Sequence, residues 1–105
     1  IKKLNCWPET DQSNLYEETL KIMKEANVVL ELNTSGLDHP CKEFYPNKDT
    51  LALACKLGVP VTLGSDSHHP SQVSRHFESA INILKSVGYT RITRFRNRMR
   101  GEIEI

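Results

Sequence analysis

Helical and strand-like segments alternate along this chain, and the alternation limits its possible folds more than any other feature. Apolar residues recur at helical spacing through residues 15–26, and the β-branched run 28–32 follows after a single asparagine. Asn47 is placed to cap a second helix that ends at Gly58, and the apolar run 59–63 begins at the next residue. The two apolar runs show little polar alternation, which predicts strands buried on both faces. This order is typical of an α/β fold with parallel strands.

The remaining third of the chain is predicted to add one more helix and an extended tail. Pro70 suits the first turn of a helix whose apolar side continues to Val87, and Gly88 is the expected stop. Residues 89–105 alternate apolar and charged side chains, which indicates two short strands that turn at Gly101.

Size and composition predict a single small domain, residues 1–105, of an ordinary globular kind. Lys and Arg (14) nearly balance Asp and Glu (13), so a net charge of +1 neither requires nor excludes an anionic partner. Cys6, Cys41 and Cys55 are widely spaced and form no CxxC pair, which favours free thiols in a reducing cytoplasm. No apolar run is long enough to span a bilayer, so no membrane partner is expected.

Asp66 and His68 are the sharpest functional candidates, because they come directly after the second apolar strand. Residues two apart in an extended segment point the same way, so a carboxylate oxygen and a ring nitrogen can converge on one cation. The alternative makes Asp66 and Ser67 caps of the following helix and leaves the histidines exposed. His69 and His76 are weaker candidates, for which surface or capping roles are expected.

A long polar loop follows the first strand and is expected at the same rim as Asp66. The backbone N–H groups of this loop, with the side chains of Asn33 and Ser35, are candidates for contacting a substrate. The alternative is an ordinary turn in which these side chains bond their own backbone. Glu31 shares a strand face with Asn33, and a buried carboxylate there needs a partner, so Glu31 is a third substrate-binding candidate.

Three sequence blocks together suggest a family. They are Glu-Leu-Asn-Thr-Ser-Gly-Leu at 31–37, Glu-Phe-Tyr-Pro at 43–46 and Gly-Val-Pro-Val-Thr-Leu-Gly-Ser-Asp-Ser-His at 58–68. In combination they resemble the C-terminal part of the polymerase-and-histidinol-phosphatase (PHP) superfamily, and its histidinol-phosphatase branch most closely. The resemblance extends from about residue 15 to residue 87.

The resemblance implies a distorted (β/α)7 barrel of the TIM-like type, of which this chain would be the C-terminal portion. It implies a metal-dependent phosphatase that hydrolyses L-histidinol phosphate in histidine biosynthesis, with a trinuclear cluster of zinc, manganese or iron. Asp66 and His68 match the last metal-binding motif of the family, and Asp66 is also a candidate to accept a proton from the attacking water. The family's N-terminal His-x-His is absent from these 105 residues. The chain alone is therefore expected to be incomplete and to need the N-terminal half of the barrel, or an oligomer, to cover its exposed strand edges.

One departure from the family pattern concerns the substrate phosphate. Relatives often carry an arginine directly after the leucine of the first block, and here that residue is Asp38. An arginine there would be a natural phosphate clamp. His39, Lys42 or Arg75 is expected to replace it.

Two other functions remain open from the sequence. A polymerase PHP domain or another nucleic-acid phosphoesterase would use the alternating residues Arg94, Arg96, Arg98 and Arg100 as one cationic strand face. The low net charge makes this alternative less favoured than a small phosphate ester as partner. The third possibility is a catalytically incomplete piece with a structural role only.

Overall fold

The structure is a computed structural model that describes residues 9–105. Its elements in chain order are α1 (Ser13–Glu25), β1 (Leu30–Asn33), the 3-10 turn η2 (Ser35–Asp38), α2 (Lys48–Lys56), β2 (Val61–Gly64), the 3-10 turn η3 (Pro70–Gln72), α3 (Phe77–Ser86), β3 (Arg91–Arg96) and β4 (Met99–Glu104). β1 pairs with β2 in parallel, and β3 pairs with β4 antiparallel. The predicted α/β class and parallel strand pair are confirmed. Within residues 9–105 the strands form two separate two-stranded sheets and no closed barrel.

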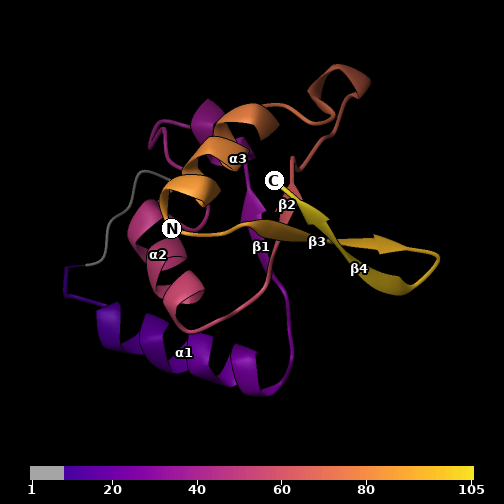
Figure 1. The fold of residues 1–105 in the computed structure, drawn as a ribbon. Coiled ribbons are helices and arrows are strands. Elements are labelled where there is room, and N and C mark those ends of the chain that lie inside the picture. Colours follow the sequence, from indigo (N-terminus) through magenta and orange to yellow (C-terminus); the bar gives the residue numbers. More distant parts are fainter. Residues whose placement is uncertain (1–8) are drawn as a thin grey trace.

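One face of the β1–β2 pair carries the core. Leu32 and Val61 are 0% and 1% exposed, and they lie in one apolar cluster with Leu51 of α2 and with Ala80 and Leu84 of α3. Figure 1 shows α2 and α3 on the same side of the two strands. Two helices that bury their apolar stripes against one sheet face form the usual two-layer solution for a small α/β unit.

The opposite face of the pair is polar, and within residues 9–105 the first strand is buried on one face only, not on both as predicted. Glu31 pairs with Thr62 in the sheet register, and Asn33 pairs with Gly64. Glu31 is exposed, and Val28, which the sequence placed in the strand, is 48% exposed and precedes β1. The helices cover only the face that carries leucine and valine, which leaves the alternate side chains of β1 uncovered.

A side chain accepts a free N–H group at the start of each of the first two helices, and for α2 this is the predicted cap Asn47. The Asp11 carboxylate accepts the N–H of Ser13 at 2.9 Å, and the Asn47 side chain accepts the N–H of Thr50 at 3.1 Å. Gly58, with φ of +70°, follows the end of α2 as expected. A second small apolar cluster joins α1 to α2 through Leu20, Ala54 and Val59. In the part of the chain that the structure describes, none of the helices has the length and apolar character to cross a membrane.

The third helix does not begin at Pro70 as predicted. Pro70 opens only the short turn η3, and Ser74 and His76 adopt left-handed φ angles of 61° and 59° before α3 starts. A left-handed residue interrupts a right-handed helix. The buried hydroxyl of Thr34 donates to the carbonyl oxygen of Arg75 at 2.7 Å, so a contact from the β1 loop anchors the non-helical segment.

The C-terminal strands form a hairpin whose turn differs from the prediction. The turn residues are Asn97 and Arg98, with φ angles of 51° and 63°, whereas Gly101 lies within β4 opposite Arg94. Two left-handed residues in sequence are typical of the tight turn that suits a twisted hairpin. β3 passes close to β2, and the tip of the hairpin extends away from the helices (Figure 1).

Candidate functional site

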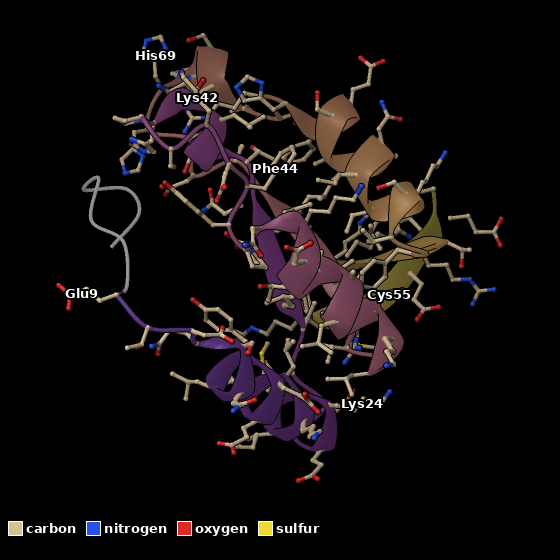
Figure 2. All side chains as sticks on the ribbon, turned by 90° about the vertical axis from the view of Figure 1, so that its left-hand side faces the viewer. Glu9, Lys24, Lys42, Phe44, Cys55 and His69 are labelled. Carbon is tan, nitrogen blue, oxygen red and sulfur yellow. The ribbon has the colours of Figure 1, made fainter. Side chains whose placement is uncertain are left out.

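The loops that follow β1 and β2 meet at one end of the molecule. The backbone N–H of Thr34 donates to the carbonyl oxygen of Gly64 at 2.8 Å, directly beyond the paired strands. Figure 2 shows Lys42, from the loop after β1, and His69, from the loop after β2, at the same end of the molecule, with Lys24 at the opposite end. The shared rim predicted from the parallel strands is confirmed, and it is where α/β folds usually carry their functional loops.

Asp66 and His68 lie on this rim in a tightly bent segment. Asp66 has a left-handed φ of 47°, so the segment is not extended as predicted, and both side chains are exposed. The Nδ1 atom of His68 lies 2.9 Å from the backbone carbonyl oxygen of Asp66. Because a carbonyl oxygen only accepts, Nδ1 carries the proton in this bond and Nε2 keeps a free lone pair. Metal-binding histidines are commonly oriented through their second nitrogen in this way.

The rest of the bent segment is held by Gln72. The side-chain oxygen of Gln72 accepts the N–H of His68 at 2.9 Å, and its backbone oxygen accepts the hydroxyl of Ser67 at 2.7 Å. His69 takes the cap position of η3 and accepts the N–H of Ser71 through Nδ1. Asp66 and Ser67 therefore do not cap the next helix, but His68 and His69 are exposed as that alternative predicts, and the capping role expected for His69 is confirmed.

Glu31, Asn33 and Ser35 form a connected polar group on the uncovered face of β1. Asn33 Nδ2 donates to Glu31 Oε1 at 3.1 Å, and Asn33 Oδ1 accepts both the N–H and the hydroxyl of Ser35 at 2.9 and 2.7 Å. These are the bonds that the turn alternative predicts for Asn33 and Ser35, and Ser35 is only 2% exposed. Glu31 leans over Gly64, where an added Cβ would lie 2.5 Å from its carboxyl carbon. The Glu31 carboxylate thus points toward the rim.

Arg75 and Asp38 are joined across the two loops. Arg75 Nη1 lies 3.1 Å from Asp38 Oδ2, while Nε and Nη2 donate to the backbone oxygens of Ser65 and Asp66 at 3.1 and 3.5 Å. His76 Nε2 lies 2.9 Å from Asp38 Oδ1, and this hydrogen bond is the main reason that the pKa of Asp38 is lowered. All three guanidinium nitrogens have partners, which leaves Arg75 poorly suited to replace a phosphate clamp. Sequence spacing gives no signal for this cluster, because Asp38 is far from the others in the chain.

The metal-ligand set is small. Residues 9–105 contain no group of three or more His, Cys, Asp or Glu side chains arranged to hold an ion. Asp66 and His68 are suitable donors for one cation, but the described residues do not fit a trinuclear cluster by themselves.

Cys41 and Cys55 are free thiols, and their surroundings shift their pKa values in opposite directions. The Sγ of Cys41 lies 3.1 Å from the hydroxyl of Tyr45, and this hydrogen bond lowers the pKa of the Cys41 thiol. Burial, with the same hydrogen bond, raises the pKa of Tyr45 to about 12. Burial also raises the pKa of the Cys55 thiol. Cys6 lies outside the described residues.

The hairpin arginines do not form one cationic face, so that prediction is wrong. Arg94 and Arg96 share a face with Met99, whereas Arg100 lies opposite Phe95 on the other face. Arg98 occupies the turn, and Arg100 Nη1 donates to the backbone and side-chain oxygens of Asn27 at 3.1 and 2.8 Å. The hairpin turn at 97–98 separates the arginines, because it reverses the chain in the middle of the series.

A mainly apolar groove of about 580 Å³ lies elsewhere, between α1 and the segment that leads into α2. Its lining includes Tyr16, Met23, Phe44, Tyr45 and Thr50. None of the five predicted site residues lines this groove.

Comparison with known proteins supports a relation to phosphatases. The chain is 35% identical over 79 residues to a probable histidinol-phosphatase of Deinococcus radiodurans, which covers 75% of this chain and 30% of that protein. It is 38% identical over 65 residues to a probable phosphatase of Clostridium acetobutylicum. The matched residues make up 61% of this chain and 26% of that relative. No protein-family model matches the chain. The chain thus spans less than a third of the length of these two relatives.

Proposed function

We propose that this chain supplies one edge of the active site of a metal-dependent phosphomonoester hydrolase of the PHP superfamily. The proposed reaction converts L-histidinol phosphate and water to L-histidinol and phosphate, as a step of histidine biosynthesis in the cytoplasm. The observation that carries the proposal is the similarity to the probable histidinol-phosphatase of D. radiodurans, combined with Asp66 and His68 on the rim of a parallel strand pair. Such rims hold the functional loops of TIM-like barrels.

The proposed metal ligands are Asp66 and His68. A carboxylate with an imidazole suits zinc, manganese or iron, and the free Nε2 lone pair of His68 is available to an ion. The remaining ligands of a trinuclear cluster would come from further strands of a (β/α)7 barrel, including a His-x-His motif. When bound, such metals lower the pKa of a coordinated water and neutralise the oxygens of a phosphate ester.

Other residues of the chain are assigned to the substrate. The Glu31 carboxylate is exposed on the polar strand face and has the charge to hold the amino group of histidinol phosphate. Asn33 orients that carboxylate, and Ser35 orients Asn33. Asp66 is proposed to accept a proton from the attacking water, since its side chain is exposed beside His68.

The polar face of the β1–β2 pair supports the proposed barrel. In a barrel of parallel strands, alternate residues face the interior and the helices cover the outside. Here the leucine and valine face is covered by α2 and α3, and the Glu31 and Asn33 face is not. We assign the second face to the barrel interior, which further strands, or a second molecule, would close.

The test measures phosphate release from L-histidinol phosphate by a protein that contains every strand of the proposed barrel. Zn²⁺, Mn²⁺ or Fe²⁺ is supplied. Activity is expected to disappear with a chelator and to fall by about 100-fold or more in Asp66→Asn and His68→Gln. His69→Gln is the matched control, because His69 is adjacent but bonds to Ser71, and it should retain activity. Chelator-resistant turnover, absence of turnover with every metal, or equal losses in His68→Gln and His69→Gln would contradict the proposal.

A further inference from the structure

Arg75 contacts both loops of the rim. Its side chain is 19% exposed and reaches three acceptors: Asp38 from the loop after β1, and the backbone oxygens of Ser65 and Asp66 from the loop after β2. Its own backbone oxygen accepts the hydroxyl of Thr34 at 2.7 Å. Arg75 therefore ties the two loops together through both its backbone and its side chain.

The local backbone would not adopt this arrangement without support. Ser74 and His76, on either side of Arg75, and Asp66 all have left-handed φ angles between 47° and 61°. Such angles are unfavourable for residues other than glycine, and they persist where surrounding contacts hold them. Arg75 therefore lies among three residues whose backbone angles need supporting contacts, and its own bonds are among those contacts.

The carbonyl oxygen of Asp66 connects Arg75 to His68. This oxygen accepts from Arg75 Nη2 at 3.5 Å and from His68 Nδ1 at 2.9 Å. The second bond fixes the imidazole tautomer that leaves Nε2 free, and it also sets the direction of the ring. Asp38 in turn holds Arg75, so one chain of contacts runs from the β1 loop to the proposed metal ligand.

We infer that Arg75 is a positioning residue: clamped by Asp38, it fixes the backbone of the Asp66–His68 segment and thereby presents His68 Nε2 to a divalent cation. The inference rests on the proposed function in taking Asp66 and His68 as metal ligands. It replaces the expectation that Arg75 binds the substrate phosphate, since phosphate would have to displace both Asp38 and two backbone oxygens.

Arg75→Lys and Arg75→Ala are the direct variants. A lysine keeps the charge, but its donors lie on a single nitrogen and cannot reproduce the spacing of the three guanidinium nitrogens. Both variants should therefore lose the positioning, whereas a phosphate ligand would be partly replaced by lysine. Asp38→Asn weakens the clamp while Arg75 remains, and a smaller loss is expected. Arg96→Lys is the matched control, because Arg96 is exposed on the hairpin, remote from the rim.

The first measurement is the tautomer of His68 by ¹⁵N NMR in the metal-free protein at a pH where the ring is neutral. The wild-type protein and Arg96→Lys are expected to show the proton on Nδ1. Both Arg75 variants should shift toward the Nε2-protonated form that free histidine prefers. The second measurement is the dissociation constant for Mn²⁺ alone, expected to rise about tenfold or more in the Arg75 variants.

Retention of the wild-type tautomer and Mn²⁺ affinity in both Arg75 variants would overturn the inference. An unchanged tautomer with a raised KM for histidinol phosphate would also overturn it, because Arg75 would then be a substrate ligand. If Arg75→Ala fails to fold, Arg75→Lys and Asp38→Asn decide the matter. A wild-type protein that releases no phosphate would refute the proposed function, whereas the His68 tautomer would still report on Arg75.

Discussion

Gly64 and Gly36 both leave little room for a Cβ atom, but alanine should change the unfolding free energy by different amounts at the two positions. A Cβ at Gly64 would lie 2.5 Å from the carboxyl carbon and Oε1 of Glu31 and 2.8 Å from Oε2. These atoms end a flexible, exposed side chain, so the carboxylate can swing away. Gly64→Ala loses the bond between Glu31 and Asn33, worth about 0.5–1.5 kcal/mol. Alanine regains about 0.4–1 kcal/mol by restricting the unfolded chain. The net change in unfolding free energy is expected to stay within about 1 kcal/mol.

Gly36→Ala is expected to cost more, because its neighbour is backbone. A Cβ at this buried position would overlap the carbonyl oxygen of Glu43 and lie 2.9 Å from the ring of Tyr45. The loop that pairs Asn33 with Tyr45 would have to shift to make room. Overpacking of this kind costs about 1–3 kcal/mol, and the backbone contact places Gly36→Ala at the upper end.

Urea unfolding of the two variants, with KM for histidinol phosphate, tests this reasoning. Gly64→Ala should keep a near-native midpoint but raise KM, since it moves the carboxylate assigned to the substrate amine. Adding Glu31→Ala to Gly64→Ala should then change KM little further, because both substitutions remove the same contact. Equal destabilisation by Gly64→Ala and Gly36→Ala, or additive effects of Gly64→Ala and Glu31→Ala on KM, would refute the placement of Glu31.

Three further outcomes are expected. Because the folded pKa of Asp38 is below 3.8, the stability from its ionised carboxylate is present above the unfolded pKa. It is lost as pH falls through the folded value, so NMR titration of Asp38 should show a midpoint below that of an ordinary aspartate, and an ordinary midpoint would contradict the hydrogen bond between His76 and Asp38. Iodoacetamide at neutral pH should modify Cys41 before Cys55, because their pKa values are shifted down and up, and Tyr45→Phe should slow Cys41. Equal rates of modification at Cys41 and Cys55, measured by peptide mass spectrometry, would contradict this difference in reactivity. Arg98→Gly should raise the unfolding free energy by about 0.5–1 kcal/mol, since Arg98 holds a φ of 63° in the hairpin turn; a lower melting temperature would contradict it.

The elements that the sequence predicted well are those set by neighbouring residues. Asn47 caps α2 within one turn, and Gly58 ends it, so both bounds follow from local chemistry. The parallel pairing follows from helices that return the chain to the start of the next strand. The helix bounds needed only residues within a few positions of each other, and the pairing needed only the order of helices and strands along the chain.

The elements that the sequence missed depend on distant contacts or on a competing local signal. Apolar spacing continues through Val73 and Phe77, so periodicity favours one long helix there. The observed break is held by Thr34, which lies 41 positions before its partner Arg75 in the chain. The turn was predicted at Gly101 because glycine is common in turns. Asparagine also tolerates left-handed angles, so Asn97 indicated the observed turn.

The candidate site divides in the same way. Asp66 and His68 were identifiable because ligand-type residues directly follow an apolar strand, and the bond that orients His68 comes from a residue two positions away. Gln72 holds this short segment from a few positions away. Arg75, itself held by Asp38, holds it as well, and no spacing rule connects these two residues to it. Asp38 drew notice only because it stands where the resemblance leads one to expect an arginine.

The structure gives that departure a physical reason. An arginine at position 38 would set its guanidinium against that of Arg75, where the Asp38 carboxylate now lies 3.1 Å away. Two like charges at that distance repel, and Arg75 would be driven from the backbone oxygens of Ser65 and Asp66. Position 38 and position 75 therefore constrain each other: a chain with Arg75 in this place requires an acceptor at 38. Asp38 is then one half of the contact that shapes the proposed metal-binding segment. Under the proposed function, the substrate phosphate would be bound by other groups on the rim, such as His39 or Lys42.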